Sequence, residues 1–323
     1  MKRTVLLSAL LCAIALAGCA SRSFLATPEA ATKPVTDVAA RVQALLPLDA
    51  LLLGEQHDAP DHQRIHREVI EALAARGALA AVVLEMAMQG NSTANLANSS
   101  SQGGAGASED AVRAALKWDE QAWLWASYAP AIMAAVRSGV PVLGSNVPRA
   151  QMGAAIKQVD LEQRLSGPAL KAQQQLIRLG HCNLLPESQI SPMARIQIAR
   201  DMAMANVIVQ ALASSAKTVP TAQAATPSNP AAAATTVTAI TANAPNSSKP
   251  ANTVVLLAGS GHVDRTLGVP QHLPPGVKAK SILLVAGLAS NAGDRASDFD
   301  AVWAAAPVPA KDYCAGLKAK FKG

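Results

Sequence analysis

Short apolar runs alternate along this sequence with segments of helical periodicity, and this alternation is the feature that most constrains the fold. The apolar runs are Ala50–Leu53, Ala80–Leu84, Val140–Leu143, Thr253–Ala258 and Ser281–Val285. The helical patterns are Pro60–Arg76, Glu109–Arg137 with a break near Lys117–Asp119, Arg149–Leu165, Pro168–Leu179 and Pro192–Leu212. Runs that are apolar on both faces are typical of buried parallel strands. The order therefore predicts an α/β fold with a largely parallel central sheet and helices on both faces.

Two low-complexity stretches interrupt this pattern. Residues 91–108 are rich in Asn, Ser, Gly and Ala, and residues 214–252 in Ala, Thr, Pro, Asn and Ser. Such segments bury too little apolar surface to offset the entropy lost on ordering, so we interpret both as insertions. Strand-like sequence resumes directly after the second stretch. We therefore expect residues 37–323 to form a single α/β domain.

The N-terminus has the pattern of an export signal. A basic start precedes an apolar run that is too short to span a membrane, and Leu16-Ala17-Gly18-Cys19 resembles the bacterial lipobox. We expect residues 1–18 to be cleaved and Cys19 to be acylated with palmitate-type chains, so that residues 19–36 form a lipidated N-terminus and tether. No aspartate follows the cysteine, which favours the outer membrane. The predicted location is the cell envelope, with anchoring in the lipid bilayer.

The charge and the cysteine content indicate which partners and which cross-links to expect. The formal net charge of +6 falls to +4 when Lys2 and Arg3 leave with the signal, and no Lys/Arg cluster remains, so we expect no nucleic-acid partner. Beyond the signal and the lipidation site, the remaining cysteines are Cys182 and Cys314. An even pair in an oxidising compartment predicts a disulfide, with two separate buried thiols as the alternative.

Two Gly-x-x-His turns follow predicted strands, at residues 54–57 and 259–262. Because the carboxyl ends of parallel strands share one edge of a sheet, where ligands bind in such folds, we expect both histidines there. The second strand ends at Glu85, and Arg149 follows the third, so these side chains are expected at the same place. We interpret Arg149 as the ion-pair partner of Glu85, in either a structural or a ligand-binding role.

Several motifs in one order resemble those of the ChaN-like haem-binding lipoproteins of the Tiki/erythromycin-esterase superfamily. They are residues 53–58 with His62, residues 84–86, 146–149, 200–203, and 259–263 followed by 268–270. The resemblance implies a membrane-anchored haem-binding protein of haem and iron uptake, some relatives of which pair two haems across a dimer. A homodimer and an outer-membrane haem receptor are the partners it suggests. The long Ala/Thr-rich insertion and the scarcity of tyrosine depart from the family pattern.

With haem as the ligand that the resemblance implies, the strand ends, the family match at His62 and the rare Tyr128 give a set of candidate haem-contacting residues: His57, His62, Glu85, Tyr128, Arg149 and His262. His57, His262 and Tyr128 are alternative ligands for the haem iron, since imidazole and phenolate both serve that role. Tyr128 shares a helical face with Trp118 and Trp125, a spacing that also predicts an aromatic core stripe. His62 and His66 are four residues apart and share a helix face as well. This spacing fits either a pair of metal ligands or a solvent-exposed helix face. Tyr313 is interpreted as structural, beside the expected disulfide.

Hydrolysis is the alternative function. His57, His262, Glu55 and Glu85 can hold a divalent transition metal that activates water, or a histidine with Glu55 can act as a metal-free base. The turn at residues 259–262 does not match the Gly-x-Ser-x-Gly pattern of serine hydrolases. Placement of Asp201 close to Glu55 and His57 would favour the enzyme. We expect a haem-binding protein rather than an enzyme.

Overall fold

The computed structural model describes residues 34–99, 106–217 and 253–321. The predicted signal at residues 1–18, the predicted lipidation site Cys19, most of the predicted tether and part of each predicted insertion lie outside the described residues. Within the three described ranges, none of the helices has the length and apolar character that a membrane span requires.

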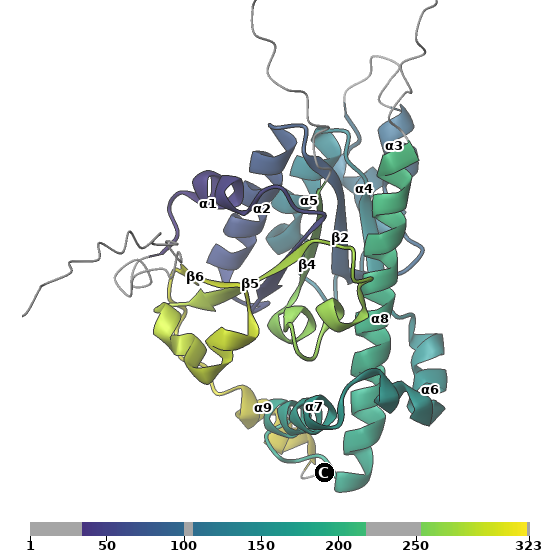
Figure 1. Ribbon diagram of the computed structural model, residues 1–323, viewed down its shortest axis with the longest axis vertical. Helices are drawn as coiled ribbons and strands as arrows, with labels where there is room; N and C mark the ends of the chain where they lie inside the picture. Colours follow the sequence, from purple (N-terminus) through teal and green to yellow (C-terminus); the bar gives the residue numbers. More distant parts are fainter. Residues whose placement is uncertain (1–33, 100–105, 218–252, 322–323) are drawn as a thin grey trace, which may run out of the picture.

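In the described part of the chain, six parallel strands form the central sheet, in the order β3-β2-β4-β1-β5-β6 (Figure 1). The strands are β1 Ala50–Glu55, β2 Leu79–Met88, β3 Val142–Asn146, β4 Thr253–Gly259, β5 Ala279–Ala286 and β6 Ala301–Ala305. The first five contain or overlap the apolar runs of the sequence. Together with helices on both faces, this confirms the predicted α/β class.

Helices cover the sheet on two sides, so that alternate side chains of each strand enter different cores. The α-helices are α1 Val38–Leu45, α2 Pro60–Ala74, α3 Ala94–Ser99, α4 Glu109–Leu116, α5 Trp125–Arg137, α6 Arg149–Lys157, α7 Gly167–Gly180, α8 Glu187–Lys217 and α9 Tyr313–Phe321. Leu51 and Leu53 of β1 join the core formed with α2 and α5, whereas Leu52 joins the core formed with α8. This period of two explains why the strand is apolar throughout and fully buried.

Helix boundaries differ from the sequence pattern where local backbone geometry intervenes. The break expected near Lys117 is present, because Lys117 adopts a left-handed conformation (φ 47°) and ends α4. The pattern that starts at Arg149 ends as an α-helix at Lys157 and continues as the 3-10 helix η3, Val159–Arg164. Helix α8 extends to Lys217, beyond the start of the expected insertion at residue 214.

Strand β6 and helices α1, α3 and α9 have no counterpart among the strands and helices predicted from the sequence, and α3 lies within the expected insertion at residues 91–108. The β6 sequence is alanine-rich, so its intrinsic strand preference is weak. It forms a strand because it pairs with β5 and places the buried Trp303 in the core beside α2. Tertiary pairing, rather than local pattern, therefore determines this edge of the sheet.

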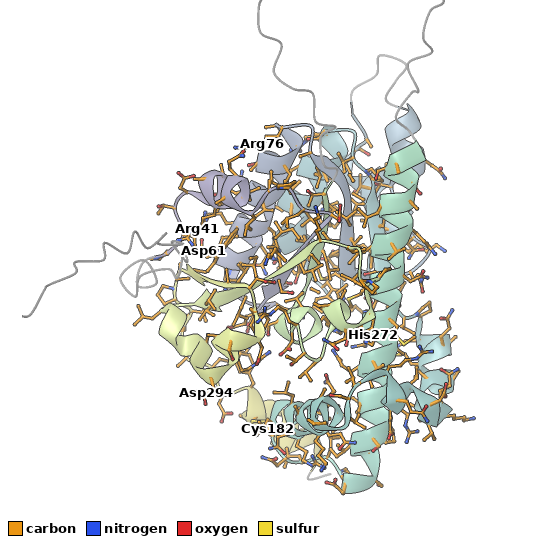
Figure 2. All side chains as sticks on the ribbon, in the orientation of Figure 1. Arg41, Asp61, Arg76, Cys182, His272 and Asp294 are labelled. Atoms are coloured by element: carbon orange, nitrogen blue, oxygen red, sulfur yellow. A yellow bond between two sulfur atoms is a disulfide. The ribbon has the colours of Figure 1, made fainter. Side chains whose placement is uncertain are left out.

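A group of helices extends beyond the carboxyl edge of the sheet. In Figure 1, α6, α7, α9 and the first half of α8 gather at the lower end of the molecule, and α8 continues upward along the sheet. Side chains fill the space between these helices, and Cys182 lies among them (Figure 2). The group brings residues of α8 and of the C-terminal segment close to the strand ends.

Candidate functional site

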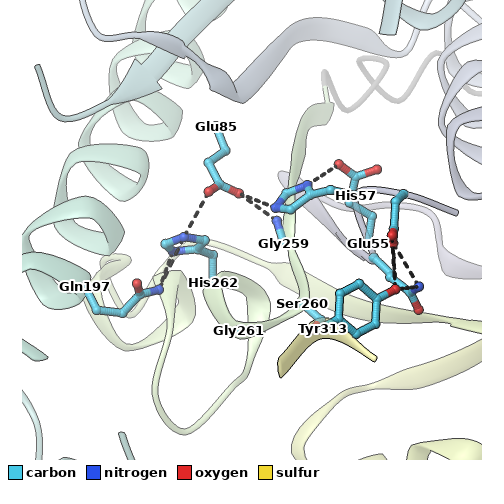
Figure 3. Close-up of a pocket in the computed structure, with 11 residues that line it drawn as sticks. Glu55, His57, Glu85, Gln197, Gly259, Ser260, Gly261, His262 and Tyr313 are labelled. Atoms are coloured by element: carbon cyan, nitrogen blue, oxygen red, sulfur yellow. Dashed lines mark hydrogen bonds and ion pairs between the residues drawn. The ribbon is translucent and has the colours of Figure 1, made fainter. Parts of the chain in front are cut away.

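Polar side chains from three neighbouring strands meet at the carboxyl edge of the sheet. Strand β1 ends at Glu55, β2 carries Glu85, and β4 ends at Gly259, and the turns that follow β1 and β4 supply two histidines. They surround a cleft of about 480 Å³ whose lining includes His57, Glu85, Gln197, Gly259, His262 and Tyr313 (Figure 3). The expectation that the two Gly-x-x-His turns meet at one edge is confirmed.

Glu85 joins the two histidines. Its Oε1 lies 3.3 Å from His262 Nε2, its Oε2 lies 3.8 Å from His57 Nε2, and the Gly259 N–H donates to Oε2 at 2.7 Å. Burial by itself would raise the pKa of Glu85, but the charges of His262 and His57 and the Gly259 hydrogen bond lower it to about 2. Glu85 is therefore a buried carboxylate with a complete set of partners.

His262 lies between two carboxylates. Its Nδ1 is 2.5 Å from Asp201 Oδ1, opposite the contact with Glu85, and the Gln197 amide lies 2.9 Å from the same nitrogen. Burial would lower the pKa of His262, but Glu85 and Asp201 outweigh it and raise the pKa to about 10. His262 is a cation at neutral pH, and both ring nitrogens are engaged. Iron ligation by this residue would need one ion pair to be displaced.

His57 presents one ring nitrogen to the cleft. Its Nδ1 lies 2.7 Å from Glu55 Oε1, and an ionised carboxylate only accepts, so Nδ1 carries the proton and Nε2 faces Glu85 and the cleft. The side chain is 36% exposed and packs edge-on against Trp123, with ring centroids 4.7 Å apart. Burial would lower the pKa of His57, but its hydrogen bond to Glu55 and the Glu85 charge raise it. Among the candidate residues, His57 has the most accessible donor.

Tyr128 lies beneath His57 rather than in the cleft. It is 2% exposed, and its hydroxyl donates to Glu55 Oε1 at 2.7 Å. Burial and the neighbouring Glu55 raise the pKa of the phenol far above its ordinary value. Its ring packs against Trp118 and Trp123. Trp118 also contacts Trp125, as expected, but Trp118 lies before α5 and does not share a helical face with the other two. As folded, Tyr128 orients Glu55, and a role as iron ligand stays a prediction.

His62 and His66 are buried below the same turn. The Gln56 N–H donates to His62 Nδ1 at 3.0 Å, so His62 holds the turn that carries His57. His66 Nδ1 lies 3.6 Å from Glu55 Oε2 and makes no hydrogen bond. Burial, with the nearby His66, lowers the pKa of His62 to about 4. These two histidines lie in the interior and not on a solvated helix face.

The interpretation of Arg149 as partner of Glu85 is wrong. Arg149 begins α6 as an exposed residue, and the ion pairs of Glu85 are with the two histidines. The reason is the strand register, since β2 continues past Glu85 to Met88 and Met88 pairs with Asn146 at the end of β3. The end of β3 is therefore displaced along the sheet from Glu85. A contact of Arg149 with a ligand stays a prediction.

The structure adds three residues that the sequence did not place in the site. Gln197 lies one helical turn before Asp201 on α8. Its spacing of four residues from Asp201, in the family-like motif at residues 200–203, is the sequence signal that could have placed it in the site. Gln63 donates to Glu55 Oε2 at 3.0 Å, one residue beyond His62. Tyr313 lines the cleft from the C-terminal segment. Its one sequence signal was the adjacent cysteine of the expected disulfide.

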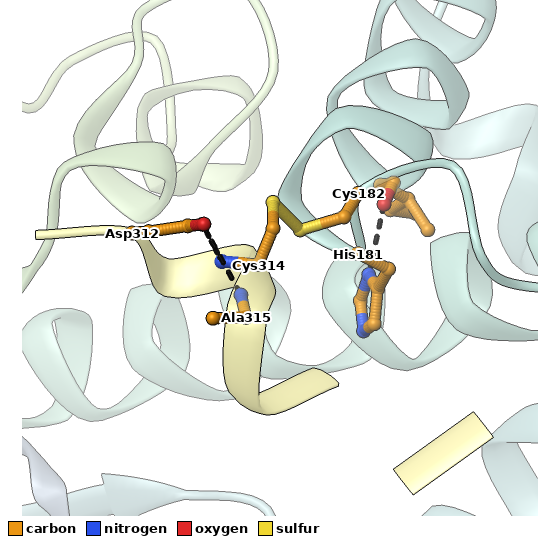
Figure 4. Close-up of a disulfide and its surroundings, with 6 residues drawn as sticks. His181, Cys182, Asp312, Cys314 and Ala315 are labelled. Carbon is orange, nitrogen blue, oxygen red and sulfur yellow. Dashed lines mark hydrogen bonds between the residues drawn. A yellow bond between two sulfur atoms is a disulfide. The ribbon is translucent and has the colours of Figure 1, made fainter. Parts of the chain in front are cut away.

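That disulfide is present. Cys182 and Cys314 are bonded, with their Cα atoms 5.7 Å apart, and they connect the end of α7 to the start of α9 (Figure 4). The prediction of a bonded pair is confirmed, and the alternative of separate thiols is wrong.

The acidic residues are not arranged as a metal centre in the described ranges. No group of three or more His, Cys, Asp or Glu side chains there is placed to hold a metal ion. Asp201 contacts His262 and not the Glu55–His57 pair, whose hydrogen bond occupies the other side of the cleft. The proximity of Asp201 to Glu55 and His57 that would favour the enzyme is not observed.

The chain is an α/β protein with helices on both faces of a parallel sheet, and its histidines and carboxylates gather at the carboxyl edge, where such folds bind ligands. The family model described as "Haem-binding uptake, Tiki superfamily, ChaN" matches residues 41–225, more than half of the chain, and the protein belongs to this family. This confirms the resemblance drawn from its motifs.

Two solved structures are similar to this chain. One is "Cofacial heme binding to ChaN of Campylobacter jejuni", with 21% identity and a TM-score of 0.55 over 81% of this chain and 89% of that chain. At this identity the similarity shows the fold. The other is the type III effector HopBA1, with 15% identity and a TM-score of 0.46 over 87% of this chain and 99% of that one. No curated protein matches the chain.

Proposed function

We propose that this protein binds haem in the cleft at the carboxyl edge of its sheet and serves haem or iron uptake. Membership of the ChaN family of haem-binding uptake proteins supports the ligand. The observation that carries the site is the arrangement of His57, whose Nδ1 is fixed by Glu55 while Nε2 faces the cleft. A fixed imidazole is the kind of donor that haem iron takes, and His57 would give up the proton of Nε2, and with it the 3.8 Å ion pair to Glu85, when it binds iron.

The cleft residues fit a haem ligand set with His57 as the leading donor. Tyr313 is the phenol that lines the cleft, whereas Tyr128 is engaged with Glu55 beneath it. His262 is engaged by Glu85 and Asp201 at its two ring nitrogens, so it is less suited to iron ligation than His57. When bound, haem would supply the iron and the flat apolar surface, and the protein would orient it through His57.

The proposal includes attachment to the envelope. The lipobox-like sequence before Cys19 supports acylation there and an outer-membrane location. The proposed protein partners are a second copy of this chain, in a homodimer, and an outer-membrane haem receptor. Labelling with an alkyne fatty acid in a bacterial host tests the anchor, with Cys19→Ala as control. Equal labelling of both proteins would contradict it.

An absorption titration with haemin tests the ligand. The mature protein is expected to give a saturable, shifted Soret band that is lost or displaced in His57→Ala, with Tyr313→Phe and Tyr128→Phe as parallel variants. A band that survives in His57→Ala and disappears in one tyrosine variant would reassign the iron ligand. Absence of any saturable band in the wild type would overturn haem binding.

A matched pair of glycine substitutions tests the location. A Cβ atom added at Gly259 would lie 3.0 Å from His57 Nε2 and 3.5 Å from Glu85 Oε2, whereas one at Gly261, in the same turn, meets nothing within 4 Å. Gly259→Ala is expected to weaken haemin binding about tenfold by crowding the donor nitrogen, and Gly261→Ala at most about twofold. Titration of both variants measures this. Equal affinities would place haem elsewhere.

The hydrolase alternative rests on one observation, the hydrogen-bonded Glu55–His57 pair, which has the geometry of a general base with its orienting carboxylate. An esterase assay with p-nitrophenyl acetate measures it. Turnover that is abolished in both Glu55→Gln and His57→Ala would support hydrolysis, and turnover no faster in the wild type than in these variants would exclude it for this substrate class.

A further inference from the structure

The C-terminal segment contacts the turn that carries His57. The Tyr313 hydroxyl donates to Asp58 at 3.0 Å and accepts from Gln56 Nε2 at 2.9 Å, and Lys311 Nζ lies 2.9 Å from Asp58 Oδ2. Gln56 and Asp58 are the two neighbours of His57 in the sequence. A single phenol therefore holds both sides of the residue that presents the donor nitrogen.

The other side of Tyr313 is attached covalently to the helical group below the sheet. The next residue, Cys314, is bonded to Cys182 just after α7 (Figure 4). The Cys314 N–H also donates to Asp312 Oδ1 at 2.8 Å, and this hydrogen bond lies at the start of α9. The disulfide and this hydrogen bond therefore fix the backbone on either side of Tyr313.

The noncovalent contacts of this segment are weak by themselves. Tyr313 is 53% exposed and the Lys311 side chain 60% exposed, and exposed hydrogen bonds and ion pairs contribute little to stability. The described side chains of residues 311–317 are exposed or only partly buried. The disulfide, which joins residues 132 positions apart, is the contact that limits the distance the segment can move.

We propose that the Cys182–Cys314 disulfide and Tyr313 form a clamp that positions the Gln56–Asp58 turn, and with it His57, at the cleft. The disulfide and Tyr313 are positioning residues in this clamp, and its consequence for haem rests on the proposed function. Glu55 and His62 hold the turn from the protein interior, and the clamp holds it from the solvent side. Cys182 and the turn lie within the family-matched residues 41–225, and the other residues of the clamp lie beyond them in the C-terminal segment.

Two variants test the clamp, Cys182→Ser with Cys314→Ser and the single change Tyr313→Phe, which keeps the ring and removes the hydroxyl. Arg178→Gln is the matched control, because it breaks the exposed Arg178–Glu187 pair near the disulfide without touching the clamp. The first readout needs no haem: amide hydrogen exchange at residues 56–58 and the NMR signal of the His57 ring. The second is the rate at which bound haemin transfers to apomyoglobin.

Both clamp variants are expected to exchange faster at residues 56–58 and to shift or broaden the His57 signal. Haemin transfer is expected to accelerate about tenfold in the double serine variant and about threefold in Tyr313→Phe, because the hydroxyl is only part of the clamp. Arg178→Gln should match the wild type in every readout.

Unchanged exchange and an unchanged His57 signal in both variants would overturn the clamp, whether or not haem binds. If the wild type fails to bind haemin while the variants still loosen the turn, the clamp stands and the proposed function falls. Tyr313→Phe keeps the test decisive if the double serine variant does not fold, since an exposed hydroxyl is not needed for folding.

Discussion

Replacement of Glu85 by alanine is expected to lower the free energy of unfolding at pH 7 by about 3–5 kcal/mol, the cost of breaking a buried ion pair on one side. The carboxylate is 4% exposed and is the shared partner of His57, His262 and the Gly259 N–H. Without it, His262 keeps only Asp201 to balance a buried positive charge. Its pKa is expected to fall from about 10 as a result.

The sign of the pH dependence follows from the two shifts. Because the folded pKa of His262 is raised to about 10 from 6.5, its contribution is fully present below pH 6.5 and is lost as the pH rises through about 10. Because the folded pKa of Glu85 is lowered to about 2 from 4.5, its contribution is present above pH 4.5 and is lost as the pH falls through about 2. The deficit of Glu85→Ala should therefore be largest between pH 4.5 and 6.5 and close to that maximum at pH 7.

Urea denaturation of the wild type and the variant across this range measures the deficit. Glu162→Ala is the matched control, because its carboxylate pairs with Arg195 in a partly exposed position and is expected to contribute at most about 1 kcal/mol. Glu85→Gln, which keeps the size and the acceptor but loses the charge, should fall between the two. Equal losses in Glu85→Ala and Glu162→Ala would show that Glu85 is not the centre of the buried cluster.

The parts of this site that the sequence predicted are those determined by strand ends. Parallel strands of an α/β fold bring their carboxyl ends to one edge of the sheet. The residues at or just after the ends of the apolar runs, His57, Glu85 and His262, could therefore be predicted as neighbours from the sequence alone. The disulfide was predicted from the number of cysteines. Both inferences depend on topology or composition and not on side-chain packing.

What the sequence could not show depends on strand register and on long-range placement. The Arg149 interpretation was wrong because β2 runs past Glu85 to Met88, and nothing in the apolar run indicates where pairing with β3 ends. The interpretation of Tyr313 as structural, beside the disulfide, agrees with its position, but the sequence does not show that the C-terminal segment returns to the turn after the first strand. Tyr128 was prominent as a rare tyrosine, yet burial of its hydroxyl against Glu55 is visible only in the fold.

Acid is expected to destabilise the protein through His62 before it protonates the surface carboxylates. His62 is 0% exposed, its Nδ1 accepts the Gln56 N–H, and its Nε2 is buried without a partner. The folded pKa is lowered to about 4 from 6.5, first by burial and then by the nearby His66. Stability from a lowered histidine pKa is present above pH 6.5 and is lost as the pH falls toward about 4. The loss from His62 is about 3 kcal/mol over that interval.

Urea denaturation at pH 7 and pH 4 checks this, with His62→Asn as the variant. The variant should be less stable than the wild type at pH 7 but should lose about 3 kcal/mol less between the two pH values, since it has no proton to take up. His181→Asn, at the partly buried C-cap of α7, is the matched histidine control. An identical loss in His62→Asn and the wild type would mean that another group carries the acid sensitivity.

The same protonation also acts on the proposed haem site. A proton on His62 Nδ1 would face the Gln56 N–H, so an accepted hydrogen bond becomes a contact between two donors. The turn would then lose one of its two interior supports, while Glu55 still holds His57 and the proposed clamp holds the turn from the solvent side. Haemin transfer to apomyoglobin should therefore accelerate between pH 6.5 and pH 4 in the wild type, and more steeply when Cys182 and Cys314 are replaced by serine. A rate that depends on pH equally in both proteins would show that the two supports of the His57 turn act independently.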